Sequence, residues 1–124
     1  MPYQIVSNNP QVVNDYNDVL FVEGSFDDVL LKTRDLAHQG HSIINHPLGA
    51  SIRMFFSPYR SIIVSAEPLP VHNLKHIEII ENSIENYHKQ MKHRTPDIKN
   101  GPDYMLIDSE LLKSALAEHG RMNN

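Results

Sequence analysis

The chain contains no cysteine, which excludes a disulfide framework, a thiolate metal centre and a thiol nucleophile. It also lacks an apolar run of about 18 residues, the usual minimum for a membrane-spanning helix. The first residues, Met1 to Gln4, have neither the basic start nor the apolar stretch of a signal peptide. We therefore expect a cytoplasmic protein that does not associate with membranes.

Positive charge is sparse. The 11 Lys and Arg residues are scattered along the chain, and the formal net charge is −4. Binding of nucleic acid requires a concentrated basic face that neutralises phosphates. We expect no nucleic-acid partner.

A metal site is not expected either, although the chain has 8 histidines. An extended segment from His41 to His46 would hold these two side chains roughly 16 Å apart, too far for one ion. His38 would lie at the end of a helix, and His88 and His93 do not have the spacing that aligns side chains on a helix.

The loop after His46 matches no phosphate-loop signature, and we expect no cofactor.

Length and composition predict one domain that spans residues 1–124. At 124 residues, of which 40% are hydrophobic, the chain is long enough to enclose one core and too short for two. No internal repeat or low-complexity segment divides it.

Local patterns predict strands that alternate with helices. The continuous apolar run at 18–22 is typical of a strand covered on both faces. Ser25 and Asp28 form a capping pair before a helix that should stop at Gly40. The expected strands are 3–7, 18–22, 41–45 and 60–65, and the expected helices are 11–16, 26–39, 73–93 and 109–119. The 73–93 helix carries an apolar stripe: Leu74, Ile77, Ile80, Ile84, Tyr87 and Met91. A polar loop at 95–102 precedes the last helix, which Asp108 or Ser109 should cap.

The order strand, helix, strand, helix, strand is typical of right-handed crossovers in a parallel sheet. We therefore expect an α/β fold, a small Rossmann-like sandwich whose mainly parallel sheet of about four strands is flanked by helices, with 18–22 as a central strand. Ligands of such sheets bind outside the carboxyl ends of the strands. The candidate ligand-binding residues at that edge are Asn8, Asn9, Glu23, Ser25, His46, Gly49, Ser51 and Arg53.

The long loop after His46 is the strongest candidate for binding an anion. Its small residues would let backbone N–H groups approach an oxyanion, while Ser51 adds a hydroxyl and Arg53 a fork of donors. The alternative is a structured turn shaped by Pro47 and Gly49, with Arg53 solvated.

The other residues at this edge also have two interpretations. Asn8 and Asn9 could hydrogen-bond a ligand, or they could cap the helix that follows them. Glu23 could act as a general base, or it could be a solvated or paired carboxylate. Ser25 doubles as the predicted helix cap.

Short segments in a fixed order also carry a resemblance. They include His46-Pro47-Leu48 and Pro58-Tyr59-Arg60-Ser61-Ile62-Ile63. The full series is 7–10, 22–25, 28–30, 34–36, 40–41, 46–48, 58–63, 79–85 and 106–116. Together these segments resemble the GrdX-like family, small proteins encoded beside the glycine, sarcosine and betaine reductase components of amino-acid-fermenting anaerobes. The resemblance spans most of the chain and implies an accessory role around amino-acid reductases, without catalytic residues to carry over.

Three functions stay open. The favoured one is a module that binds an anionic small molecule and acts in the assembly or regulation of a reductase system, with reductase components as partners. The second is an enzyme or maturation factor that uses Glu23, His46, Ser51 and Arg53. The third is a structural interaction protein that uses the long helix as a homodimer surface. The first is favoured because no set of nucleophile, base and orienting group can be assembled from the sequence.

Overall fold

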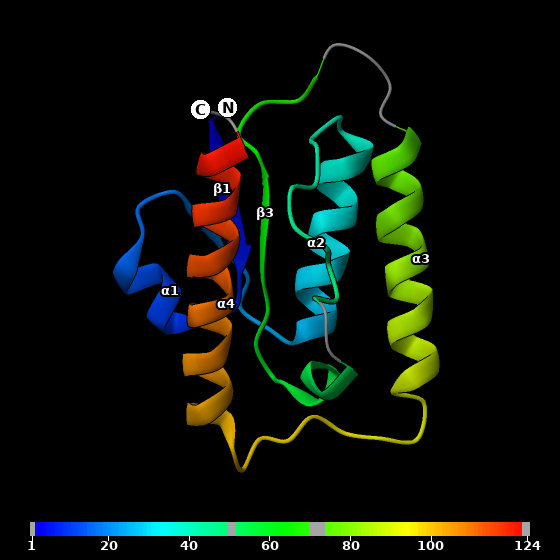
Figure 1. Ribbon diagram of the computed structural model, residues 1–124. Coiled ribbons are helices and arrows are strands. Elements are labelled where there is room, and N and C mark those ends of the chain that lie inside the picture. The colour runs from blue at the N-terminus through cyan, green and yellow to red at the C-terminus, as the bar shows by residue number, and fades with distance from the viewer. Residues whose placement is uncertain (1, 50–51, 70–73, 123–124) are drawn as a thin grey trace.

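The computed structural model describes residues 2–49, 52–69 and 74–122, with the backbone alone at 52, 53 and 122. Its elements, in chain order, are β1 (Tyr3–Ser7), α1 (Pro10–Asp15), β2 (Val19–Phe21), α2 (Phe26–His38), a 3-10 helix (Ile52–Phe56), β3 (Ser61–Ser65), α3 (Leu74–Gln90) and α4 (Gly101–Met122). Figure 1 shows a small sheet with helices on both sides. None of the helices in the described ranges is long and apolar enough to cross a membrane.

The sheet has three strands in the order β2-β1-β3 and is mixed. β1 is parallel to β2, with Ile5 beside Val19, and antiparallel to β3, with Ile5 beside Ile63. The expected mainly parallel sheet of about four strands is therefore wrong. The expectation that 18–22 forms a central strand is also wrong, because β2 is an outer strand in the order β2-β1-β3.

The third expected strand, 41–45, is reduced to a single bridge between Ile43 and Val64. A side chain replaces part of the ladder here, because the Asn45 Oδ1 atom accepts the Ile63 N–H at 2.6 Å. The described residues between Asn45 and Ser61 form only the 3-10 helix, and not the long helix that usually connects parallel strands. The chain therefore turns back, and β3 runs opposite to β1.

Side chains alternate between the two faces of the sheet. Val6 and Ile62 point to the face that α2 and α3 cover, whereas Ile5 and Ile63 point to the face that α1 and α4 cover. Figure 1 shows these two helix pairs on opposite sides of β1 and β3. All five residues of β3 are buried, so this strand lies between two layers of helix.

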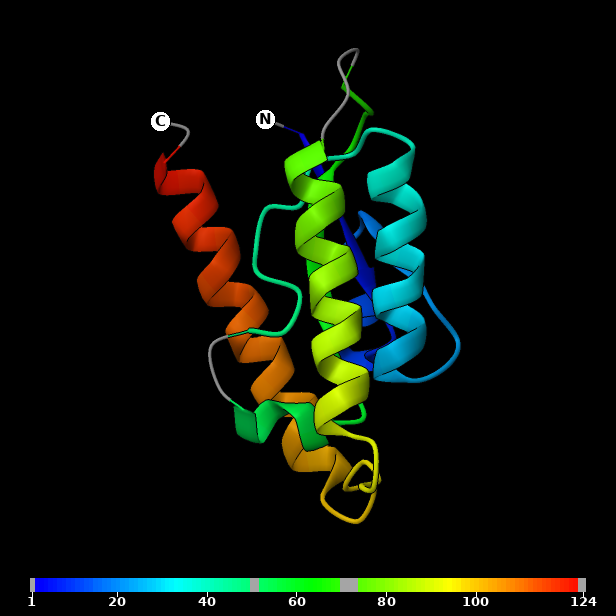
Figure 2. The same ribbon diagram turned by 90° about the vertical axis from the view of Figure 1, so that its right-hand side faces the viewer.

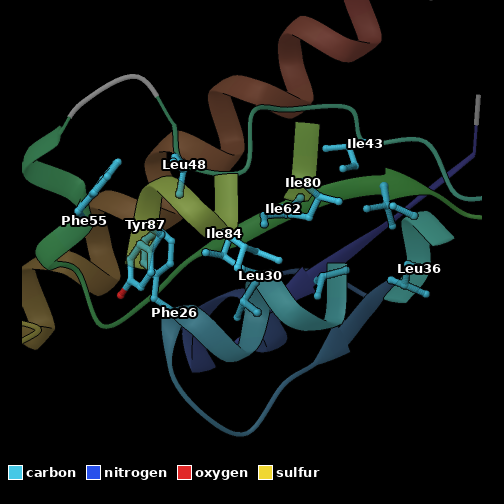
Figure 3. Packing of buried hydrophobic residues seen from close by; sticks show 14 residues of the cluster. Phe26, Leu30, Leu36, Ile43, Leu48, Phe55, Ile62, Ile80, Ile84 and Tyr87 are labelled. Atoms are coloured by element: carbon cyan, nitrogen blue, oxygen red, sulfur yellow. The ribbon is translucent and has the colours of Figure 1, made fainter. Parts of the chain in front are cut away.

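The larger core lies between the sheet and helices α2 and α3 (Figure 3). Phe26 stacks on Tyr87 with ring centroids 4.7 Å apart, and burial raises the pKa of Tyr87 to about 12. The predicted α3 stripe is confirmed at its centre, where Ile80, Ile84 and Tyr87 are buried. Leu74 is 67% exposed and does not belong to it.

Both ends of α2 follow the sequence prediction. Ser25 and Asp28 form a reciprocal capping box at its start. At its end Gly40 has a φ of 108°, in the left-handed region, and the His41 N–H donates to the Leu36 carbonyl at 3.0 Å. Glycine adopts this conformation without steric strain, which explains why the helix stops here.

Helix α4 begins eight residues earlier than expected, at Gly101 instead of Ser109. Pro102 lies in its first turn, where proline is tolerated because the missing N–H has no helical partner there. The predicted cap Asp108 is therefore inside the helix, and it is fully buried. Its surroundings form part of the candidate site.

Candidate functional site

Asn8 follows β1 and ties its end to two other segments. Its Nδ2 group donates to the carbonyl oxygens of Gly24 at 3.0 Å and Pro58 at 2.8 Å, and its Oδ1 atom accepts the Arg60 N–H at 2.9 Å. Both amide hydrogens are thus occupied by the protein. Asn8 positions the residues that precede α2 and β3.

Asn9 belongs to a buried polar network between β1, β3 and α4. Its Oδ1 atom accepts the Gln11 N–H and caps α1, while Nδ2 donates to Oδ2 of Asp108 at 3.0 Å. The Ser61 hydroxyl donates to the same carboxylate oxygen at 2.7 Å, and it contacts the Ser7 hydroxyl at 2.8 Å. Among the described residues, Oδ1 of Asp108 has no hydrogen-bond partner.

Arg60 lies directly before β3 and is only 6% exposed. Its Nε–H donates to the Pro47 carbonyl at 2.8 Å, and Nη2 donates to the His46 carbonyl, so the guanidinium holds the 46–49 segment against the sheet. Burial lowers the pKa of Arg60, and the nearby Asp108 carboxylate opposes this shift. An arginine still remains charged at neutral pH.

Among the described residues, no carboxylate lies within 4.0 Å of the Arg60 guanidinium, although Asp108 is near enough to act on its pKa. The ion pairs found among the described residues, all within 4.0 Å, involve other groups. Within the same ranges, no protein acceptor is bonded to Nη1 of Arg60. A buried guanidinium normally uses most of its donors in hydrogen bonds or pairs with a carboxylate.

Arg60 lines an open depression of about 270 Å³, which we call the Arg60 depression. The other lining residues are Asn45, His46, Gly49, Leu111 and Ala115. Gly49 has a φ of 74°, and a Cβ atom built there would lie 3.7 Å from both terminal guanidinium nitrogens. A side chain at position 49 would therefore contact the guanidinium.

His46 lines a second depression as well, of about 340 Å³, together with Leu48 and residues of α3. Figure 2 shows the segment that follows α2 running between α3 and α4. His46 belongs to this segment and lines both hollows. The His46 Nδ1 atom accepts the Leu48 N–H at 3.1 Å. Burial, and secondarily the Arg60 charge, lower the pKa of His46.

Of the eight predicted ligand-binding residues, the structure brings His46 and Gly49 together in the Arg60 depression. Glu23 and Ser25 are exposed at the start of α2 and do not line it. Ser51 and the Arg53 side chain lie outside the part of the chain that the structure describes. Their predicted role stays a prediction.

Sequence reasoning missed Arg60 and Asp108. Arg60 lies in the 58–63 segment that carries the family resemblance and begins the expected strand 60–65, and this position was the only sign in the sequence that it could matter. Asp108 lies four residues before Leu112, on the same helix face. Leu112 is 1% exposed, so the polar member of that pair had to face the core too.

The sequence was also compared with protein families, with curated proteins and with solved structures. The model of the GrdX-like protein family matches residues 4–117. The chain belongs to the GrdX-like family. The match covers nearly the whole chain and includes every residue that lines the depression of this GrdX-like protein. No curated protein and no solved structure matches it.

Proposed function

We propose that this GrdX-like protein is an accessory module that binds a small anion in the Arg60 depression. The observation that supports this is a buried guanidinium that lines an open hollow without a carboxylate within 4.0 Å among the described residues. Charges are rarely buried unless they are paired. A bound anion would supply the missing partner.

The hydrogen bonds of Arg60 hold its guanidinium in place before a ligand arrives. Nε and Nη2 are fixed by the Pro47 and His46 carbonyls, and Nη1 remains for a ligand. A guanidinium binds carboxylate or phosphate oxygens through charge-assisted hydrogen bonds. Because this geometry is set beforehand, little side-chain entropy is lost on binding.

His46 can supply a second donor. Its Nδ1 atom accepts the Leu48 N–H, so the neutral imidazole carries its hydrogen on Nε2. That N–H is the group left for a ligand. Asn45, in contrast, already uses both ends of its amide on β3, at Ile63 and Ser61.

Binding is supported better than catalysis. In serine hydrolases the nucleophilic hydroxyl donates to an imidazole, which a carboxylate orients. The Ser61 hydroxyl instead donates directly to Asp108, and its side-chain partners in the described ranges, Ser7 and Asp108, include no imidazole. Ser61 is also 1% exposed. Beside the amino-acid reductases with which the family is encoded, a binding module would act in assembly or regulation.

The test is a thermal-stability screen with phosphate, formate and acetate. A ligand at a hundred times its dissociation constant stabilises the native state by about 2.7 kcal/mol. In Leu111→Glu the new carboxylate lies at the depression and repels the anion, and we expect binding about tenfold weaker or more. Leu106→Glu, on the same helix but away from the depression, is the control with the same charge change.

Arg60→Lys keeps the positive charge but removes the planar fork of donors, so it tests whether the fork contributes to binding. We expect the affinity for the anion to be about tenfold lower. Circular dichroism checks that this variant is folded. The proposal fails if no anion stabilises the protein. It also fails if Leu111→Glu binds the anion as tightly as Leu106→Glu does.

A further inference from the structure

The Arg60 depression has two chemically different sides. Arg60, His46 and Gly49 form a polar side from the loop and the start of β3. Leu111 and Ala115 of α4 form an apolar side. They are four residues apart, so they lie on one face of the helix.

Leu111 is 41% exposed although it lies beside a buried charge. An inorganic anion on Arg60 would leave this side chain in contact with water. An apolar group attached to the anion would cover it. The volume of about 270 Å³ lies just below the range of pockets for drug-sized ligands, which limits that group to a short one.

We propose that the ligand is a small carboxylate with a short aliphatic tail. Its carboxylate meets Nη1 of Arg60 and the His46 imidazole, and its tail lies against Leu111 and Ala115. This inference rests on the proposed function, because it names the class of anion that the same site takes. The described lining offers no carboxylate for a tail that carries a positive charge.

The physical consequence is a dependence of affinity on chain length. Each methylene buried against an apolar wall contributes about 0.8 kcal/mol, which corresponds to roughly fourfold in affinity. The carboxylate contact is the same for every member of such a series. The slope therefore measures the apolar side, and the affinity of the shortest member measures the polar side.

The experiment is a calorimetric titration of the full-length protein with formate, acetate, propionate and butyrate. We expect affinity to rise by roughly fourfold with each added carbon until the hollow is filled. In Leu111→Ala the rise should become clearly shallower while formate binds as before. Leu106→Ala is the matched control, since Leu106 is also an exposed leucine of α4, at 52%, and does not line the hollow.

The outcomes separate the two proposals. If formate and butyrate bind the unaltered protein equally, the aliphatic tail is wrong and anion binding stands. If the slope persists in Leu111→Ala, the tail lies elsewhere and the inference is overturned. If no carboxylate binds at all, the inference fails, and the phosphate arm of the stability screen decides whether anion binding stands.

Discussion

The two faces of the sheet are built differently. On the α2 and α3 face, the strands contribute aliphatic side chains to a large apolar cluster. On the α1 and α4 face, a small apolar cluster of Ile5, Val12, Ile63 and Leu112 lies beside the buried network of Ser7, Asn9, Ser61 and Asp108. The Arg60 depression borders this second face, because α4 forms one of its walls.

The two faces therefore contribute to the structure in different ways. Apolar burial is non-directional and stabilises the fold through buried area. Hydrogen bonds are directional, so a buried polar network fixes the position of one element relative to another. Here the network fixes α4 against β1 and β3, and thereby holds Leu111 and Ala115 opposite Arg60.

The largest loss of stability is expected from a substitution on the sheet face that α2 and α3 cover. Ile80 is fully buried, and Ile80→Ala should lower the free energy of unfolding by about 2–4 kcal/mol through lost transfer energy and a cavity. Urea denaturation measures this. Leu74→Ala on the same helix is the control and should change stability by less than about 0.5 kcal/mol. Equal losses in the two variants would show that α3 does not pack as described.

A smaller loss of stability is expected from a substitution in the polar network on the sheet face that α1 and α4 cover. Asp108→Ala removes the carboxylate oxygen that the Ser61 hydroxyl and one Asn9 amide hydrogen share as acceptor, and should lower the free energy of unfolding by about 1–3 kcal/mol. Asp108→Asn keeps an acceptor oxygen and should lose less. Asp103→Ala, on the exposed side of α4, is the control. If Asn costs as much as Ala at position 108, the negative charge and not the hydrogen-bond pattern holds this face together.

Sequence patterns predicted the local structure well where apolar spacing and capping act within one element. The capping box at Ser25 and the buried centre of α3 are examples. The loss of the 41–45 strand could not be predicted, because it involves the distant contact between the Asn45 side chain and Ile63. The start of α4 was missed because Pro102 breaks a helix in its interior but is accepted in the first turn.

The candidate site was predicted in part. The loop after His46 does line a hollow, at His46 and Gly49. Arg60 also lines this hollow; it lies eleven residues after Gly49 and reaches the loop through tertiary hydrogen bonds to Pro47 and His46. Sequence spacing favoured Arg53 because it lies inside the loop, and that choice stays a prediction because the Arg53 side chain lies outside the described part of the chain. No local pattern shows that an arginine before a strand points back to an earlier loop.

The smallest expected change is a dependence of stability on pH. It arises at two histidine hydrogen bonds to the 41–49 segment, which runs between the helices of the two faces. His76 accepts the Ile43 N–H through Nδ1 at 2.9 Å, and His46 accepts the Leu48 N–H in the same way. Burial lowers the pKa of both imidazoles. The unfolded chain therefore binds more protons than the native state as the pH falls through about 6.5, and stability should decrease on acidification.

This pH dependence can be measured by urea denaturation at about pH 7.5 and about pH 5.5. In His76→Asn the amide oxygen can still accept the Ile43 N–H but does not titrate, so the loss of stability on acidification should become smaller. His93→Asn, at an exposed position, is the control and should leave the loss of stability on acidification unchanged. A protein that becomes more stable on acidification would contradict the assigned hydrogen bonds of His46 and His76.

The central claim, that Arg60 faces a ligand site, is tested most directly by NMR of the arginine side-chain N–H groups during titration with propionate. We predict that the Arg60 guanidinium signals and the Gly49 backbone amide shift together and saturate at one common dissociation constant. Saturable shifts confined to other residues, with the Arg60 signals unchanged, would contradict the claim.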